Sequence, residues 1–271
     1  MAPDRTVPDA DGMPMLGLGT GGIEDPAEIE RALERGYRHL DTAIAYGNEG
    51  VVGEAIAESD VDDRDLFVAT KLPRDELSYS DAVQAANESH ARLGVDRIDL
   101  LYVHWPLGDY DADETMMALD QLVDDGVAWR IGVSNFTPDL LTEAEGETAN
   151  GIFANQVEMH PLLPQTELRE VCEDHGIEVV AYAPLARGKV TEVPEIQRVA
   201  EKHDATAAQV SLAWLREKGV TAIPKGTGDH VAENWTSLDV ELDVDDVERI
   251  DGIEERHRCV DPDDAPWNRG L

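Results

Sequence analysis

Four side chains that could act together in proton transfer follow three neighbouring β-rich segments of the sequence. Asp41 ends the segment Tyr-Arg-His-Leu-Asp, Lys71 ends Leu-Phe-Val-Ala-Thr-Lys, and His104 ends Asp-Leu-Leu-Tyr-Val-His. Tyr46 lies in the loop directly after Asp41. If the three segments are successive parallel strands, their carboxyl ends meet at one edge, and we expect these side chains to share a site there.

The combination suits the reduction of a carbonyl group. Hydride addition to the carbonyl carbon leaves negative charge on the oxygen, which then needs a proton. A tyrosine such as Tyr46 can supply that proton when a neighbouring ammonium, here Lys71, stabilises the phenolate. Asp41 would hold the lysine in place, and His104 would donate a hydrogen bond that orients the substrate.

Each of the four residues also has an ordinary structural explanation. Asp41 can cap the following helix, and Lys71 can lie at the surface. His104 can be a hydrogen-bonded core histidine, and Tyr46 can be a packing residue. Their coincidence at neighbouring strand ends, in a chain with few lysines, favours the shared site.

The order of the segments predicts the fold, because β-rich runs alternate with amphipathic stretches as in parallel sheets with helical crossovers. The predicted strands are Met15–Thr20, Tyr37–Thr42, Leu66–Lys71, Ile98–Trp105, Arg130–Asn135, Phe153–Glu158, Val179–Ala183 and Val220–Pro224. The predicted helices include Pro26–Arg35, Glu49–Glu58, Ser80–Leu93, Thr115–Asp124, Gln165–Asp174, Ala205–Glu217 and Asp243–Glu255. Eight such strands favour a closed (β/α)8 barrel, an α/β TIM barrel that forms one domain over residues 1–271; an open doubly wound sheet is the alternative.

Glycines and turns support this division of the chain. A left-handed residue is expected just past five of the helices, at Gly36, Gly94, Gly126, Gly176 and Gly219. Asp11-Gly12, within Arg5–Pro14, predicts a small hairpin that closes the bottom of the barrel. The tail Arg256–Leu271 shows no periodicity.

A glycine-rich segment after the first predicted strand offers a different interpretation. Gly17, Gly19 and Gly22 match the G-x-G-x-x-G spacing of a Rossmann dinucleotide site. No acid follows a second strand at the expected spacing except Asp41, so this match stays an alternative to the barrel.

Six short motifs occur in one order along the chain and together resemble the aldo-keto reductase family. They are Asp41-x4-Tyr46-Gly47-Asn48-Glu49, Val103-His104-Trp105-Pro106, Gly132-Val133-Ser134-Asn135-Phe136, Asn155-Gln156-Val157-Glu158, Tyr182-Ala183-Pro184-Leu185-Ala186-Arg187-Gly188 and Ile223-Pro224-Lys225. Each motif alone is weak, whereas the ordered set covers the chain from about Leu16 to Asn234. Within the family, the chain is similar to prokaryotic members of the diketogluconate and aldehyde reductase type.

The resemblance implies an NAD(P)H-dependent enzyme that reduces an aldehyde or ketone to an alcohol. It makes Tyr46 the proton donor of a tetrad with Asp41, Lys71 and His104. It also implies cofactor contacts for Gly19, Thr20, Ser134, Asn135, Gln156, Tyr182, Pro184, Leu185, Lys225, Glu233 and Asn234, and a substrate contact for Trp105. Within that set, Ser134, Asn135 and Gln156 would bind the nicotinamide carboxamide, and the Tyr182 ring would stack on the nicotinamide.

The chain departs from the family's usual pattern in two places. Gly21 and Gly22 stand where relatives usually carry a bulky pocket residue, and the loop at 106–112 and the C-terminal loop are short, so the resemblance does not imply a substrate. Gly226 replaces a hydroxyl residue, and His230 lies near the expected arginine of the site for the adenosine 2′-phosphate. NADP is therefore the expected cofactor, with NAD as the alternative.

The charge is strongly acidic, with 58 Asp and Glu against 22 Lys and Arg and a net charge of −36. Such a surface repels nucleic acids and anionic membranes. Because the acids are spread over the predicted helices, they indicate adaptation to molar salt and hence a halophilic source.

The remaining features favour a cytoplasmic monomer that acts on a small carbonyl compound. Met1–Arg5 shows no signal peptide, and no run is long and apolar enough to span a membrane. Cys172 and Cys259 are expected to be reduced thiols, with no metal site. Two other functions stay open: a non-catalytic nucleotide-binding barrel, and a lyase that uses Lys71 as a Schiff base.

Overall fold

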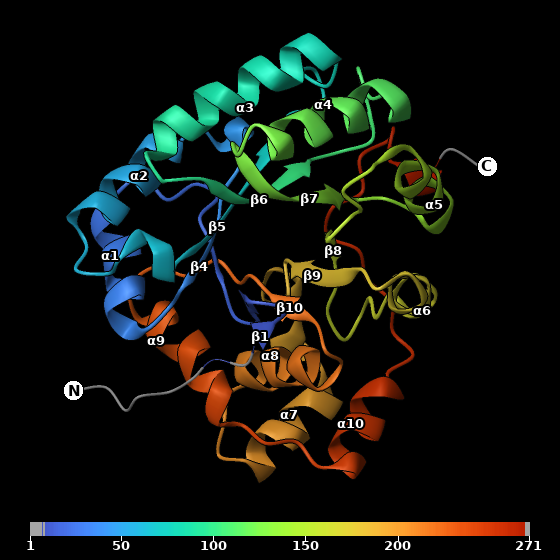
Figure 1. Ribbon diagram of the computed structural model, residues 1–271. Helices are drawn as coiled ribbons and strands as arrows, with labels where there is room; N and C mark the ends of the chain where they lie inside the picture. Colours follow the sequence, from blue (N-terminus) through green and yellow to red (C-terminus); the bar gives the residue numbers. More distant parts are fainter. Residues whose placement is uncertain (1–6, 8, 269–271) are drawn as a thin grey trace.

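The computed structural model describes residue 7 and residues 9–268, and its centre is a closed ring of eight parallel strands (Figure 1). Along the chain these strands are β3 (Leu18–Gly19), β4 (His39–Asp41), β5 (Phe67–Leu72), β6 (Ile98–Val103), β7 (Ala128–Ser134), β8 (Ala154–Glu158), β9 (Glu178–Tyr182) and β10 (Thr221–Ala222). Each strand pairs with the next in parallel register. Parallel bridges from Leu16 to Ala222 and from Gly19 to Lys225 join the first strand to the last. The predicted (β/α)8 barrel is confirmed, and the open doubly wound sheet is wrong.

Helices cover the outside of the strands all round the ring (Figure 1). They are α1 (Pro26–Arg35), α2 (Glu49–Glu58), α3 (Tyr79–Leu93), α4 (Ala112–Asp124), α5 (Pro138–Glu147), α6 (Thr166–His175), α7 (Pro194–Lys202), α8 (Ala207–Glu217), α9 (Asp229–Trp235) and α10 (Val244–Asp251). Short 3₁₀ helices are η1 (Ile44–Tyr46), η2 (Asp63–Asp65), η3 (Ala186–Glu192), η4 (Thr236–Asp239) and η5 (Pro266–Asn268). The five glycines expected past helix ends all have positive φ.

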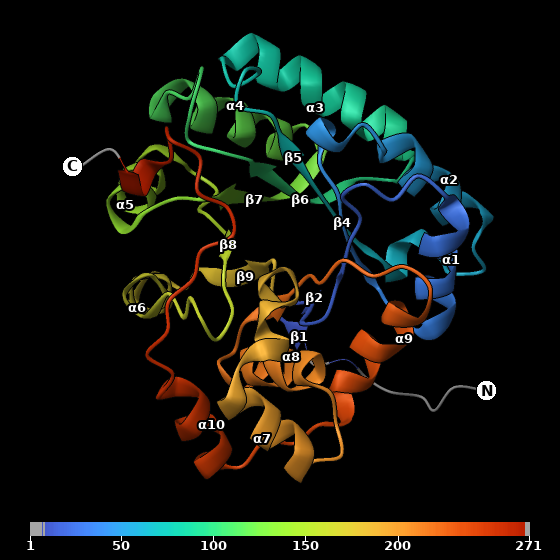
Figure 2. The ribbon, with the colours of Figure 1, turned by 180° about the vertical axis from the view of Figure 1, so that it is seen from behind.

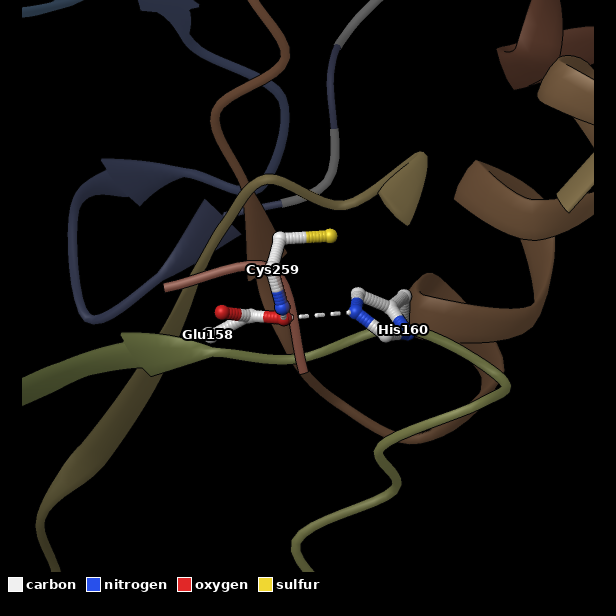
Figure 3. Close-up of side chains that lie close together, drawn as sticks. All are labelled: Glu158, His160 and Cys259. Atoms are coloured by element: carbon white, nitrogen blue, oxygen red, sulfur yellow. Dashed lines mark hydrogen bonds and ion pairs between the residues drawn. The ribbon is translucent and has the colours of Figure 1, made fainter. Parts of the chain in front are cut away.

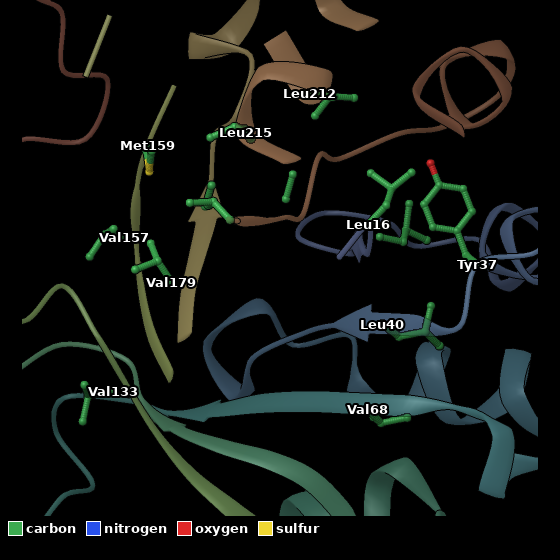
Figure 4. Close-up of a cluster of buried hydrophobic side chains, with 14 of the residues drawn as sticks. Leu16, Tyr37, Leu40, Val68, Val133, Val157, Met159, Val179, Leu212 and Leu215 are labelled. Carbon is green, nitrogen blue, oxygen red and sulfur yellow. The ribbon is translucent and has the colours of Figure 1, made fainter. Parts of the chain in front are cut away.

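Two apolar layers hold the barrel together. The outer layer packs strand side chains such as Leu40, Val68 and Val179 against helices that include α8 (Figure 4). The inner layer fills the ring and contains Met13, Phe67, Leu100, Tyr102, Val180 and Ile223. Burial of this apolar surface is the main source of stability in such a fold.

The predicted hairpin is present where the structure describes it. Strands β1 (Asp9–Ala10) and β2 (Met13–Pro14) pair in antiparallel register, and Asp11 and Gly12 both have positive φ. Met13 is fully buried in the inner layer, so the hairpin closes the bottom of the barrel as expected. The earlier part of this segment, apart from Val7, and the start Met1–Arg5 lie outside the described residues.

The glycines of the Rossmann-like spacing have structural reasons within the barrel. A side chain at Gly17 would meet the His39 ring at 2.8 Å, and one at Gly19 would meet the Ile223 carbonyl at 2.8 Å. These glycines therefore let neighbouring strands approach closely, and the Rossmann interpretation is wrong.

The last helix differs from its predicted form at its C-terminal end. The last helix was expected to reach Glu255 but ends at Asp251, because the chain turns at Gly252 and Ile253 is buried. Beyond α10 the chain runs back past β9 and β8 toward α5 (Figure 2). This places the described part of the aperiodic tail beside the carboxyl ends of the strands.

Candidate active site

A cavity of about 710 Å³ opens at the carboxyl ends of the strands. Most of the site residues expected from the sequence line it: Gly19, Asp41, Tyr46, His104, Trp105, Ser134, Asn135, Gln156, Tyr182, Pro184, Leu185, Lys225, Glu233 and Asn234. Lys71 and Thr20 do not line it and are fully buried. Thr20 instead donates a hydrogen bond from its hydroxyl to the Asp41 carbonyl, at 3.0 Å.

A buried ion pair forms the base of the site. The Lys71 Nζ donates to Asp41 Oδ1 at 2.5 Å and to the Thr42 carbonyl at 2.7 Å. The second carboxylate oxygen, Asp41 Oδ2, accepts from Gln156 Nε2 at 2.8 Å. Both charges are thus paired and hydrogen bonded, which is what burial of charged groups requires. The alternatives of a surface Lys71 and of a helix-capping Asp41 are therefore wrong.

Tyr46 connects this buried pair to the cavity. It ends η1, and the left-handed Gly47 (φ 69°) turns the chain away after it. The Tyr46 ring is 38% exposed, and its centroid lies 5.3 Å from Lys71 Nζ. Gly21 faces the ring at ordinary contact distance, since a side chain there would begin 3.5 Å from it. Tyr46 can therefore reach both the lysine and a molecule in the cavity.

His104 lies edge-on to Tyr46, with ring centroids 5.8 Å apart and an interplanar angle of 83°. Burial and the nearby Lys71 charge lower the pKa of His104 to about 3. At neutral pH its imidazole is therefore uncharged and can donate one hydrogen bond without adding a cation to the site.

Hydroxyl and amide groups cluster at the ends of β7, β8 and β9. Ser134 Oγ donates to the Gln156 carbonyl at 2.8 Å, and Tyr182 Oη donates to Asn135 Oδ1 at 2.8 Å. Asn135 adopts a left-handed conformation (φ 65°), which asparagine tolerates better than most residues. Its Nδ2 donates to the His104 carbonyl at 3.0 Å, so this polar cluster is tied to the strand that carries His104.

Another group of lining residues has a different character. Lys225 lines the cavity, and a side chain at Gly22 would come within 3.2 Å of its Nζ. Glu233 pairs with His230 at 3.1 Å. A side chain at Gly226 would begin 3.3 Å from Asn234 Nδ2, so this position has little room for a larger residue.

Sequence reasoning missed the contribution of the C-terminal segment. Glu158 Oε1 accepts from the backbone N–H of Cys259 at 2.6 Å, and Glu158 Oε2 accepts from that of Val260 at 2.8 Å. His160 Nε2 lies 3.0 Å from the same carboxylate (Figure 3). The carboxylate thereby fixes the segment at the end of β8, where Val260 lines the cavity.

The same segment supports one wall of the site. Trp267 packs against Trp105 with ring centroids 5.8 Å apart, and the Arg258 guanidinium lies 4.1 Å from the Trp267 ring centroid. The lining also contains Arg187, which belongs to the motif that begins at Tyr182 but was not among the expected cofactor contacts. Long-range contacts of this kind leave no local pattern, so neither Val260 nor Trp267 could be predicted from the sequence.

Comparison with known proteins assigns this arrangement to a family. A family model described as "Aldo/keto reductase family" matches residues 16–255. An aldo-keto reductase of Mycolicibacterium smegmatis is 40% identical over 99% of both chains, and the glyoxal reductase of Bacillus subtilis is 38% identical over 91% of both. The solved structure of a Bombyx mori aldo-keto reductase in complex with NADP is 32% identical, with a TM-score of 0.84, and the match covers 93% of this chain and 92% of that one.

Proposed function

Because this chain belongs to the aldo/keto reductase family and is an NAD(P)H-dependent oxidoreductase that reduces carbonyl groups, we propose that Tyr46 is its proton donor. The observation that carries this role is the position of the Tyr46 ring, which is exposed to the cavity yet 5.3 Å from the buried Lys71 ammonium. Lys71 does not line the cavity, and its ammonium already donates a hydrogen bond to Asp41. Both observations argue against a Schiff base at this lysine.

The chain's own groups account for the proton that carbonyl reduction needs. The nicotinamide supplies a hydride to the carbonyl carbon when the cofactor is bound. Tyr46 donates its proton to the carbonyl oxygen, and the Lys71 ammonium stabilises the phenolate that is left. Asp41 holds Lys71 in place, and the neutral His104 donates a hydrogen bond to the same oxygen. Solvent can return the proton, because Tyr46 is partly exposed.

The cavity suits a dinucleotide cofactor in size and in the order of its groups. Its volume of about 710 Å³ lies within the range of small-molecule sites. Ser134, Asn135 and Gln156 would bind the carboxamide at one end, and the Tyr182 ring would support the nicotinamide. Lys225, which also lines the cavity together with Asn234, offers a cation.

We propose that this protein prefers NADPH as its cofactor and uses NADH less well. Lys225 would bind the adenosine 2′-phosphate, since a phosphate of nearly two negative charges needs local positive charge in so acidic a protein. In Lys225→Ala we expect kcat/KM with NADPH to fall about tenfold or more, and kcat/KM with NADH to change much less. Equal losses with both cofactors, or a wild type that prefers NADH, would contradict this role.

The reaction itself is tested with Tyr46→Phe. We expect turnover of an aldehyde panel, followed by loss of NADPH absorbance in molar KCl, to fall by two orders of magnitude or more. Cofactor binding, measured by fluorescence titration, should stay within about twofold because only the hydroxyl is removed. Near wild-type turnover in a folded variant would remove Tyr46 from its role.

The residues that line the cavity indicate a class of substrate, and the net charge and the thiols indicate a cellular environment. Trp105, which packs on Trp267, and Val260 line a largely apolar part of the cavity that suits a small aldehyde or dicarbonyl, and the relative from Bacillus subtilis is named a glyoxal reductase. The acidic surface supports activity in concentrated salt, and the two free thiols support a reducing cytoplasm.

None of the helices in residues 9–268 is long and apolar enough to cross a membrane. A monomer is proposed because the barrel closes within one chain.

A further inference from the structure

Tyr102 lies inside the barrel next to Lys71, in a position that the mechanism above does not use. It is on β6 and fully buried. Its register partner on β5 is Lys71, and its register partner on β7 is Gly132. Directly paired residues of neighbouring strands project to the same face, so Tyr102 and Lys71 share the interior of the barrel.

The neighbouring strand leaves room for the Tyr102 ring. A side chain at Gly132 would begin 2.5 Å from the ring, which is closer than any real contact. The ring therefore occupies the space that the side chain of β7 would fill at this level. This fixes the ring in one place between the two strands.

The ring faces the lysine from within the barrel. Lys71 Nζ lies 5.8 Å from the Tyr102 ring centroid and 5.3 Å from the Tyr46 ring centroid. Both distances are within the range of a cation–π contact, which strengthens when the cation is removed from water. The ammonium thus lies against two phenol rings, of which Tyr46 borders the cavity and Tyr102 the buried interior.

The ring of Tyr102, and not its hydroxyl, makes the contact with the ammonium. Tyr102 Oη is buried and has no hydrogen-bond partner among the residues that the structure describes. Phenylalanine would present the same aromatic face to Lys71, whereas leucine would present none. Burial and the Asp41 charge raise the pKa of Tyr102, so the phenol stays neutral beside the ion pair.

We propose that Tyr102 is a positioning residue for Lys71, and that its ring supports the ammonium from the buried side and keeps it directed at Tyr46. The proposal rests on the proposed function, in which Tyr46 donates the proton. Tyr102 itself touches neither substrate nor cofactor, because it does not line the cavity.

Comparison of Tyr102→Phe with Tyr102→Leu tests the ring. Phenylalanine keeps the aromatic face, so we expect kcat within about threefold of wild type. Leucine removes that face, and kcat should fall about tenfold while KM for the carbonyl and the affinity for NADPH stay within twofold. The descending limb of the pH–kcat profile should move to higher pH in Tyr102→Leu, because a less well held ammonium stabilises the phenolate less. The other titratable groups near the ammonium are Asp41, Tyr46, His104 and His39.

A second series separates the ring's charge distribution from its shape. Phenylalanine at position 102 with one, two and three fluorine atoms has a progressively weaker negative face and nearly the same size. We expect log kcat to fall steadily along this series, with the unfolding temperature nearly constant. Tyr110→Leu is the matched control: its hydroxyl is also buried and unpaired in the described structure, but its ring packs on Phe136.

Two outcomes would overturn the proposal. One is an unshifted pH limb in Tyr102→Leu, with a loss of kcat no larger than that of Tyr110→Leu. The other is a flat fluorine series. Either result leaves the proposed function intact as long as Tyr46→Phe is inactive, whereas an active Tyr46→Phe would refute the proton donor whatever the Tyr102 variants do.

Discussion

At the scale of single residues, the buried pair of Asp41 and Lys71 makes a direct prediction. In Lys71→Met the side chain fills a similar volume, but the ammonium that we propose stabilises the Tyr46 phenolate is lost. We expect turnover to fall by at least a hundredfold while the Kd for NADPH stays nearly unchanged, as measured by fluorescence titration. Full activity with an unchanged pH–rate profile would show that the lysine has no part in proton transfer.

The single variant also leaves the buried Asp41 carboxylate without its charged partner. Its control is therefore the double variant Lys71→Met with Asp41→Asn. Removing one partner of a buried pair costs about 3–5 kcal/mol, because the other charge is left uncompensated. The double variant removes both charges, and its unfolding temperature should recover most of that loss while turnover stays low. Recovery of turnover together with stability would mean that Lys71 acts on the fold alone.

The proposed catalytic residues could be predicted because they stand out at strand ends. A lysine, a histidine and a carboxylate following three successive strands are improbable as surface groups, and the barrel brings them together. Ser134 and Gln156 gave no such signal, since amides and hydroxyls are common in turns, and they entered only through the family resemblance. Tyr102 was invisible to sequence reasoning, because its role depends on register with Lys71 and on the missing side chain of Gly132.

At the scale of elements, Glu158 connects strand β8 to the C-terminal segment. Burial alone would raise the pKa of Glu158, but hydrogen bonds from His160 and from the backbone of Cys259 and Val260 outweigh it and lower that pKa. The tether is therefore complete above the ordinary range of a glutamate and weakens as pH falls through the lowered value.

Glu158→Gln tests this tether. An amide NH₂ cannot accept a hydrogen bond, so one of the two backbone contacts is lost. We expect faster hydrogen exchange at Cys259 and Val260 and a several-fold higher KM for the carbonyl, with kcat changed less than twofold. Cys259→Ala is the control, because the tether uses its backbone and should survive. Equal exchange and equal KM in Glu158→Gln and Cys259→Ala would contradict a positioning role for the carboxylate.

Element boundaries were predictable where local chemistry sets them. Glycine in a left-handed conformation ends α3 at Gly94 and α6 at Gly176, and both ends were expected. The strands were harder: β3 and β10 are two residues each, shorter than their apolar runs, and isolated bridges rather than a long ladder close the barrel there. Strand pairing is a property of two distant segments, so periodicity within one segment does not fix its length.

At the scale of the whole molecule, the dominant feature is a net charge of −36 on 271 residues. Individual ion pairs relieve only part of it, and several of them, such as Arg64 with Asp62 and Arg74 with Asp264, lie at the surface. Exposed pairs of this kind contribute roughly 0–1 kcal/mol each. The rest of the acidic surface repels itself in dilute buffer, and this repulsion opposes the compact state.

Salt should therefore stabilise the fold. The screening length falls from about 10 Å at 0.1 M to about 3 Å at 1 M, which is shorter than most distances between neighbouring surface charges. We expect the unfolding temperature to rise from dilute buffer to molar KCl, by about 2–4 °C for each kcal/mol of repulsion that is relieved.

The matched variant replaces three exposed acids, Glu58→Gln, Asp60→Asn and Asp65→Asn. It should unfold at a higher temperature in dilute buffer, with a smaller rise in KCl. Calorimetry over the same series with sucrose separates screening from general exclusion of solute, since sucrose should affect both proteins equally. An unfolding temperature that stays flat or falls as KCl increases would show that the acidic surface is not an adaptation to salt.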